Sequence, residues 1–85
     1  MKKKTVWVLF NSYEYGQSIY LFTTRLKTLK FACQIIKETS NIVTDDDKQT
    51  HLQRLLDDKD YKKIVNYWNS LKLDDYFEIE EKEIL

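Results

Sequence analysis

Thr5-Val-Trp-Val-Leu-Phe10 is the stretch that decides the fold, because all six residues are β-branched, aromatic or aliphatic. Such residues favour an extended strand. Side chains of a strand alternate between its two faces, with Val6, Val8 and Phe10 on one face and Thr5, Trp7 and Leu9 on the other. A strand that is apolar on both faces is typical of the centre of a sheet. We therefore expect a central strand, one face of which is covered by another molecule.

Residues 18–22 predict a second strand that pairs with the first as a hairpin. Its side chains also alternate between two apolar faces, with Ile19 and Leu21 on one and Tyr20 and Phe22 on the other. The seven residues of the connection include Gly16, the only glycine, which we expect to adopt a positive φ. Tyr13 and Tyr15 fall near the hairpin tip. They either fold back onto the hairpin or serve as exposed aromatic anchors, a class enriched in binding hot spots.

Residues 76–84 predict a third strand, because apolar Phe77 and Ile79 alternate with charged side chains. An antiparallel pairing with the first strand would set its acids opposite the N-terminal lysines, with Glu80, Glu81 and Glu83 facing Lys2, Lys3 and Lys4. Opposite charges across strands stabilise a pairing by up to about 1 kcal/mol per pair. We therefore expect the sheet order 2-1-3.

Between these strands, apolar residues recur at three- and four-residue spacing, which predicts helices. The stripes are Leu26, Leu29, Cys33 and Ile36, then Leu52, Leu55 and Leu56, then Tyr61, Ile64, Val65, Trp68 and Leu71. The expected N-caps are Thr23 or Thr24, Asp46 (in a capping box with Gln49) and Asp58. The second and third helices could also form one bent helix, because no Pro or Gly separates them.

The sequence thus predicts one α+β domain over residues 1–85, in the order ββαααβ, with a three-stranded antiparallel sheet and two or three helices packed on one face. We expect the helices to cover Val6, Val8, Phe10, Ile19 and Leu21, and to contact them through Leu29, Cys33, Ile36, Ile64 and Trp68. The other face, with Trp7, Leu9, Tyr20 and Phe22, then stays open. The two faces could be exchanged without changing this argument, and exposed apolar patches mark interaction sites.

Residues of catalytic and metal sites are scarce. Cys33, the only Cys, falls on an apolar helix face, where a buried thiol is inert, and nothing places a nucleophile beside His51, the only His. Asp45, Asp46 and Asp47 suit helix capping better than a metal, because the other ligands of a calcium loop are missing. A single glycine excludes a glycine-rich phosphate loop. We expect no enzymatic activity, no metal and no cofactor.

Charge is balanced overall but unevenly distributed. Residues 1–40 contain seven bases and two acids, whereas residues 41–85 contain seven bases and twelve acids. The halves either neutralise each other or form a dipolar surface with an acidic binding patch. A net charge of zero disfavours direct nucleic-acid binding. No apolar run is long enough to span a membrane, and a lone Cys fits the reducing cytoplasm, where we expect the protein to act.

The segment Val6-Trp-Val-Leu-Phe-Asn-Ser-Tyr-Glu-Tyr-Gly16, followed by Ile19-Tyr-Leu-Phe-Thr-Thr24 and an amphipathic helix, resembles the start of small accessory proteins of bacteria and phages. The resemblance is one of pattern and brings no catalytic residues. It implies a small phage-borne protein that binds a host protein, a group that includes inhibitors of restriction, CRISPR or nucleotide-signalling defences.

The function that we expect is a non-enzymatic protein-binding module whose partner is a host protein or a second copy of the chain. The expected binding residues are Trp7, Leu9, Tyr13, Tyr15, Tyr20 and Phe22. The alternative is a protein that binds or sequesters a small ligand such as a nucleotide. In that case Tyr13, Tyr15 and Tyr20 would stack on the base.

Overall fold

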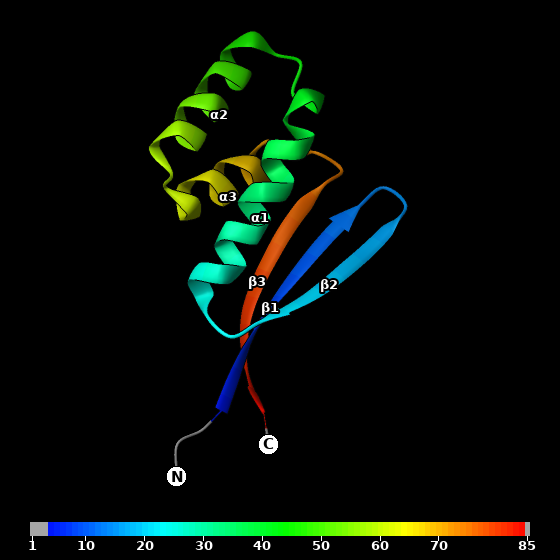
Figure 1. Cartoon of the computed structure of the whole chain (residues 1–85). Coiled ribbons are helices and arrows are strands. Elements are labelled where there is room, and N and C mark those ends of the chain that lie inside the picture. The colour runs from blue at the N-terminus through cyan, green and yellow to red at the C-terminus, as the bar shows by residue number, and fades with distance from the viewer. Residues whose placement is uncertain (1–3, 85) are drawn as a thin grey trace.

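The centre of the sheet is β1 (Lys4–Tyr13), which lies between β2 (Gly16–Phe22) and β3 (Tyr76–Ile84). The computed structural model describes residues 4–84. Both strand pairings are antiparallel, so the order β2-β1-β3 and the α+β class are confirmed (Figure 1). β1 is thus flanked by a strand on each side, as its stretch of apolar residues predicts.

Three helices lie between β2 and β3, in the predicted order. They are α1 (Arg25–Thr39), α2 (Asp46–Asp58) and α3 (Tyr61–Ser70), and a short 3-10 turn, η1 (Ser40–Ile42), follows α1. The second and third helices are separate, because Lys59 adopts the left-handed conformation with φ 56° and reverses the chain direction. The chain therefore ends α2 without a glycine or proline.

Of the three helices, only α1 has the predicted N-cap. Thr24 caps α1 by accepting a hydrogen bond from the Lys27 amide. Asp45, and not Asp46, caps α2, and Asp60, and not Asp58, caps α3. Runs of consecutive aspartates offer several equivalent caps, and the backbone conformation selects one of them.

Gln49 does not complete a capping box. Its side-chain amide donates to the carbonyl oxygens of Ser40 (2.7 Å) and Val43 (2.9 Å). It therefore ties the first turn of α2 to the connection that follows α1.

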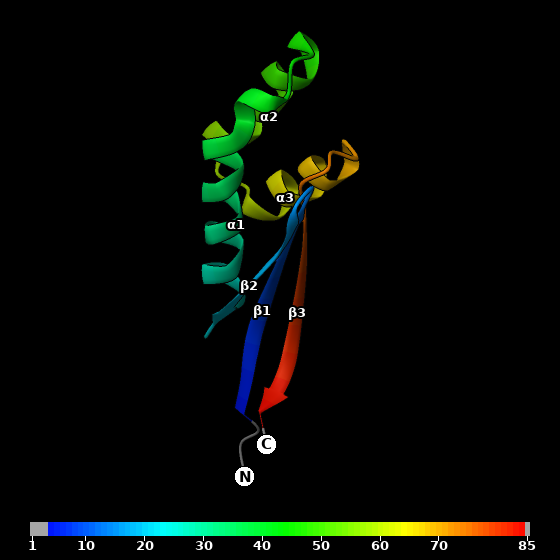
Figure 2. The same cartoon turned by 90° about the vertical axis from the view of Figure 1, so that its right-hand side faces the viewer.

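The helices cover the face of the sheet opposite to the predicted one. Leu9 is 0% exposed, and it pairs across the strands with Tyr20 of β2 and Ile79 of β3, which therefore share its face. Figure 2 shows α1 on one side of the sheet, while the other side is bare along the strands. The prediction that the helices cover Val6, Val8, Phe10, Ile19 and Leu21 is therefore wrong.

The third strand explains this choice of face. The register places its apolar residues, Phe77 and Ile79, on the same face as Leu9. Its other side carries Glu78, Glu80 and Lys82. Only the Leu9 face therefore has apolar residues on all three strands, although Glu81 and Glu83 share it farther along β3, and burying its apolar part removes the most apolar surface from water.

The pairing of β1 with β3 also differs in register from the charge-based prediction. Lys4 lies opposite Ile84, and Glu83 lies opposite Thr5. Glu80 and Glu81 face Val8 and Trp7. Lys2 and Lys3 lie outside the described residues. The register thus follows the packing of Phe77 and Ile79 against the helices, since an exposed ion pair stabilises by only a few tenths of a kcal/mol.

The core lies between this sheet face and the helices. Residues Leu9, Ile36, Leu52, Ile64 and Trp68 are almost fully buried. Cys33, Ile36, Ile64 and Trp68 belong to this core, as predicted. Leu26, in contrast, is 52% exposed on α1, and the buried stripe of that helix includes Thr28, which the apolar pattern did not predict.

Candidate binding surfaces

The uncovered side of the sheet presents an apolar surface, which we call the open face. It consists of Val6, Val8 and Phe10 of β1 with Ile19 and Leu21 of β2. Ile19 is 58% and Leu21 66% exposed, and the two lie next to apolar residues of β1 on the same face. The side that no helix covers (Figure 2) is therefore apolar along two of its three strands.

Charged residues of β3 border the open face. The Lys82 ammonium lies 5.9 Å from the centre of the Phe10 ring and 3.6 Å from the Glu80 carboxylate. Val8 is only 5% exposed, because it lies in the middle strand between Leu21 and Glu80. The open face is thus an apolar strip with a strip of mixed charge along one edge.

The predicted sheet-face residues do not form an exposed surface. Leu9 lies in the core, and Tyr20 and Phe22 pack against Phe31 of α1 with ring centres 4.6 and 5.2 Å apart. Trp7 is half-buried beside α1. The pattern of β1 and β2 did group the residues of each face correctly, but it did not indicate which face the helices would cover.

The hairpin tip separates the two predicted tyrosines. β1 and β2 continue to Tyr13 and Gly16, so the loop contains only Glu14 and Tyr15. Tyr13 folds back, with its hydroxyl 3.1 Å from the Ser18 hydroxyl, whereas Tyr15 is 89% exposed. Gly16 does not have the predicted positive φ.

Three acidic side chains lie close to Tyr15. A surface groove of about 430 Å³ is lined by Tyr13, Glu14, Tyr15, Ile42, Leu73, Asp74 and Asp75. Asp75 is held in place by a hydrogen bond from the Asn11 amide (2.6 Å). The hairpin tip is therefore aromatic and acidic.

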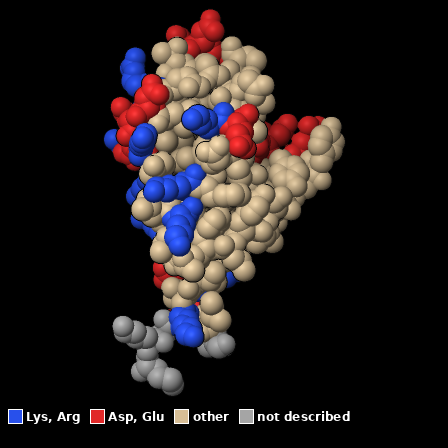
Figure 3. Space-filling view, in the orientation of Figure 1, with Lys and Arg blue, Asp and Glu red and all other residues tan. Residues whose placement is uncertain are grey.

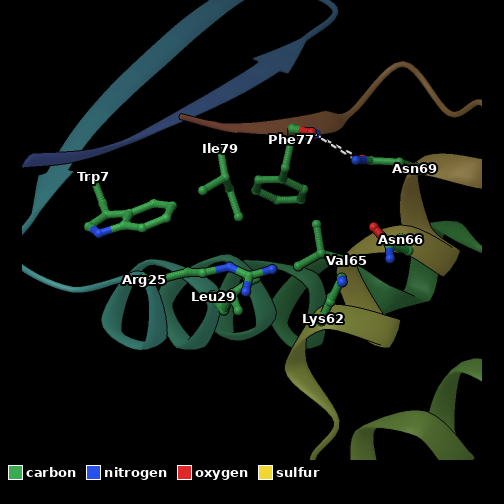
Figure 4. Close-up of a pocket in the computed structure, with 9 residues that line it drawn as sticks. All are labelled: Trp7, Arg25, Leu29, Lys62, Val65, Asn66, Asn69, Phe77 and Ile79. Atoms are coloured by element: carbon green, nitrogen blue, oxygen red, sulfur yellow. Dashed lines mark hydrogen bonds between the residues drawn. The ribbon is translucent and has the colours of Figure 1, made fainter. Parts of the chain in front are cut away.

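A second groove lies on the helix-covered side of the sheet, between the sheet, α1 and α3. We call it the basic groove; its volume is about 440 Å³, and it is lined by Trp7, Arg25, Leu29, Lys62, Val65, Asn66, Asn69, Phe77 and Ile79 (Figure 4). Its residues come from four elements, so no local sequence pattern predicts it. Figure 3 shows that Lys and Arg gather over α1.

Cys33 has the environment of an inert core residue. It is 4% exposed, and its Sγ lies 3.5 Å from the carbonyl oxygen of Tyr61. Burial raises the pKa of the Cys33 thiol from 9.0 to about 12, because the thiolate would lose its hydration. The reactive thiolate is therefore scarce at neutral pH.

His51 and the aspartate run have structural contacts. The His51 ring stacks edge-on against Tyr67, with centres 4.5 Å apart. Asp45 accepts a hydrogen bond from the Lys48 amide as an N-cap. In residues 4–84, no group of three or more His, Cys, Asp or Glu side chains could hold a metal ion. In the same residues, no helix has the length and apolar character needed to cross a membrane.

Comparison of the chain with protein-family models, with curated proteins and with solved structures finds no significant match. Function must therefore be inferred from the surfaces of the molecule itself. Two of them, the open face and the basic groove, lie on opposite sides of the sheet. They can be tested independently.

Proposed function

We propose that the protein is a non-enzymatic protein-binding module that pairs with a second copy of itself through the open face. The observation that carries this proposal is the exposure of Ile19 and Leu21 (58% and 66%) beside the apolar residues of β1. Apolar patches on a protein surface mark interaction sites. A second sheet packed face to face would remove this surface from water.

The chain exposes more surface than a compact monomer of its mass. The chain exposes 6295 Å², whereas a monomer of 10.3 kDa is expected to expose about 5400 Å². The excess is about 900 Å². The molecule measures 51 × 30 × 18 Å, so this excess reflects an elongated shape with one layer of helices.

The open face is complementary to itself. Consider a two-fold axis that crosses the strands at Val8, so that each strand lies on its equivalent in the opposite direction. The register then sets Val6 against Phe10 of the second copy, and Leu21 against Leu21 of the second copy. On β3 it sets Glu78 against Lys82 of the second copy. Apolar residues thus meet apolar residues, and Glu78 meets Lys82 twice at the rim, where these pairs flank the like-charged contact of Glu80 with Glu80 of the second copy.

The test is the mass of the protein in solution, measured by sedimentation or light scattering. We expect a dimer, and we expect Leu21→Glu to convert it to the monomer of 10.3 kDa, because a carboxylate would be buried without a partner. The matched control is Leu26→Glu, which changes a leucine of similar exposure (52%) on α1, outside the open face. It should remain dimeric.

A monomeric wild type, or equal effects of the two substitutions, would overturn the pairing. Circular dichroism of both variants establishes that each is folded. The wild type could instead be a monomer that binds a host protein, with Leu21→Glu abolishing that binding. In that case the partner of the open face would be the host protein and not a second copy.

We further propose that the hairpin tip binds a host protein, as the resemblance to small phage proteins that inhibit host defences implies. The tip stays outside the paired faces and combines the exposed Tyr15 with the acids of its groove. Such a surface is complementary to a basic protein surface, and binding should therefore weaken as salt is added.

A pull-down from host lysate tests this attachment. We expect the Leu21→Glu variant to pull down a specific host protein and the Tyr15→Ala variant to lose it. Tyr15→Ala leaves the described core unchanged. Retention by Tyr15→Ala, or binding that is insensitive to salt, would contradict the proposal.

A further inference from the structure

We propose that the basic groove binds a small organic anion that carries a flat ring, of the nucleoside monophosphate class. This inference is independent of the pairing through the open face, because the groove lies on the other side of the sheet. It also differs from the alternative of a base stacked by Tyr13, Tyr15 and Tyr20. The structure does not bring those three residues together, because Tyr20 packs under α1 against Phe31.

The walls of the groove are apolar and aromatic. Figure 4 shows Trp7, Ile79 and Phe77 pointing from the sheet toward the helices, where Leu29 and Val65 face them. The volume of about 440 Å³ lies within the range of small-molecule sites. Phe77 and Val65 are buried, so these walls belong to the core and are fixed before any ligand arrives.

Two cations from different helices face this apolar surface. Arg25 begins α1 and Lys62 lies in the first turn of α3, and Figure 4 shows both side chains reaching into the groove. Neither makes an ion pair or a side-chain hydrogen bond within residues 4–84. No acid lines the groove; Glu81, which pairs with Trp7, lies outside its lining. The groove therefore favours an anion, and an arginine suits a phosphate because its planar fork donates two hydrogen bonds.

The aromatic and amide groups favour a ring attached to that anion. Trp7 is half-buried, and its indole is a stacking surface of the kind that binds bases without sequence preference. The side chain of Asn66 is exposed and makes no hydrogen bond within the described residues, so it is available to the edge of a ring. Asn69 is not available, because both ends of its amide are bonded to Phe77.

Tryptophan fluorescence provides a direct readout. The chain has two tryptophans; Trp68 is 0% exposed in the core, so a ligand in the groove would quench only Trp7. The probes are AMP, GMP and UMP, with adenosine and inorganic phosphate as partial ligands. We expect saturable quenching by at least one nucleotide and weaker binding of both partial ligands.

Charge-removing variants locate the site. Lys62→Gln and Arg25→Gln should each weaken nucleotide binding by about tenfold, because each removes a charge-assisted hydrogen bond. The matched control is Lys63→Gln, since Lys63 neighbours Lys62 on α3 but does not line the groove. It should bind like the wild type. Trp7→Phe should lose the fluorescence signal, and calorimetry should show that this variant still binds the nucleotide.

Several results would overturn the proposal. They are no saturable quenching by any of the three nucleotides, equal affinity for inorganic phosphate or adenosine alone, or the same loss in Lys63→Gln as in Lys62→Gln. All three charge variants change exposed side chains, so circular dichroism should show the wild-type fold.

Discussion

Asn69 joins α3 to β3 through one side chain. Its amide nitrogen donates to the Phe77 carbonyl oxygen (2.7 Å), and its amide oxygen accepts from the Phe77 amide (2.9 Å). Both backbone groups of Phe77 therefore point away from β1, and Asn69 satisfies them as a neighbouring strand would. In this way one residue protects the start of an edge strand and fixes its register against the core.

At the residue scale, Asn69→Ala should lower the free energy of unfolding by about 2 kcal/mol, because two partly buried hydrogen bonds are lost. Urea denaturation followed by circular dichroism measures this difference. Asn66→Ala, on the same helix but exposed, should change it by less than about 0.5 kcal/mol. Similar losses in the two variants would show that the hydrogen bonds to Phe77 are not the cause.

Helix ends illustrate what local sequence specifies at the scale of elements. Thr24 was predicted as one of two adjacent candidates, and its backbone is extended as an N-cap requires. For α2, three consecutive aspartates are chemically equivalent. The choice of Asp45 follows from the path of the chain through η1 and the buried Val43, which no local pattern encodes.

We expect Asp45→Ala to destabilise the protein by about 1 kcal/mol, since it removes the acceptor for the Lys48 amide. Asp46→Ala keeps that cap and removes only a favourable charge near the helix dipole, so it should cost less than half as much. Thermal or urea unfolding of the two variants distinguishes them. A larger effect of Asp46→Ala would mean that the cap lies where the sequence alone had placed it.

The whole molecule is a sheet covered by helices on one side only (Figure 2). Its stability should therefore depend on how the open face is covered. If two copies pair, dimerisation stabilises the folded state by mass action.

We accordingly expect the melting temperature of the wild type to rise by several degrees when the protein concentration is increased about a hundredfold. The melting temperature of Leu21→Glu should not change with concentration. A wild type that melts at the same temperature throughout this range would contradict pairing, whatever its mass in concentrated solution.

The sequence by itself determined the elements and their partners. The period of apolar residues predicted the three strands and the helical stretches but left open whether α2 and α3 are one bent helix, and the doubly apolar stretch from Thr5 to Phe10 predicted the central strand. Alternation also grouped the side chains of β1 and β2 into the two faces that the structure has. These are local properties, because each depends on neighbours within a few residues.

Only the tertiary structure decided which face is covered and what the surfaces contain. On β1 and β2 both faces are apolar, so the choice depended on the register of β3, which sets Ile79 beside Leu9 and turns Glu78, Glu80 and Lys82 to the other side. For the same reason the basic groove became visible only when Trp7, Arg25 and Lys62, far apart in the chain, came together. Contacts between distant segments arise from burying the largest continuous apolar surface, which is a property of the assembled layers and not of any one segment.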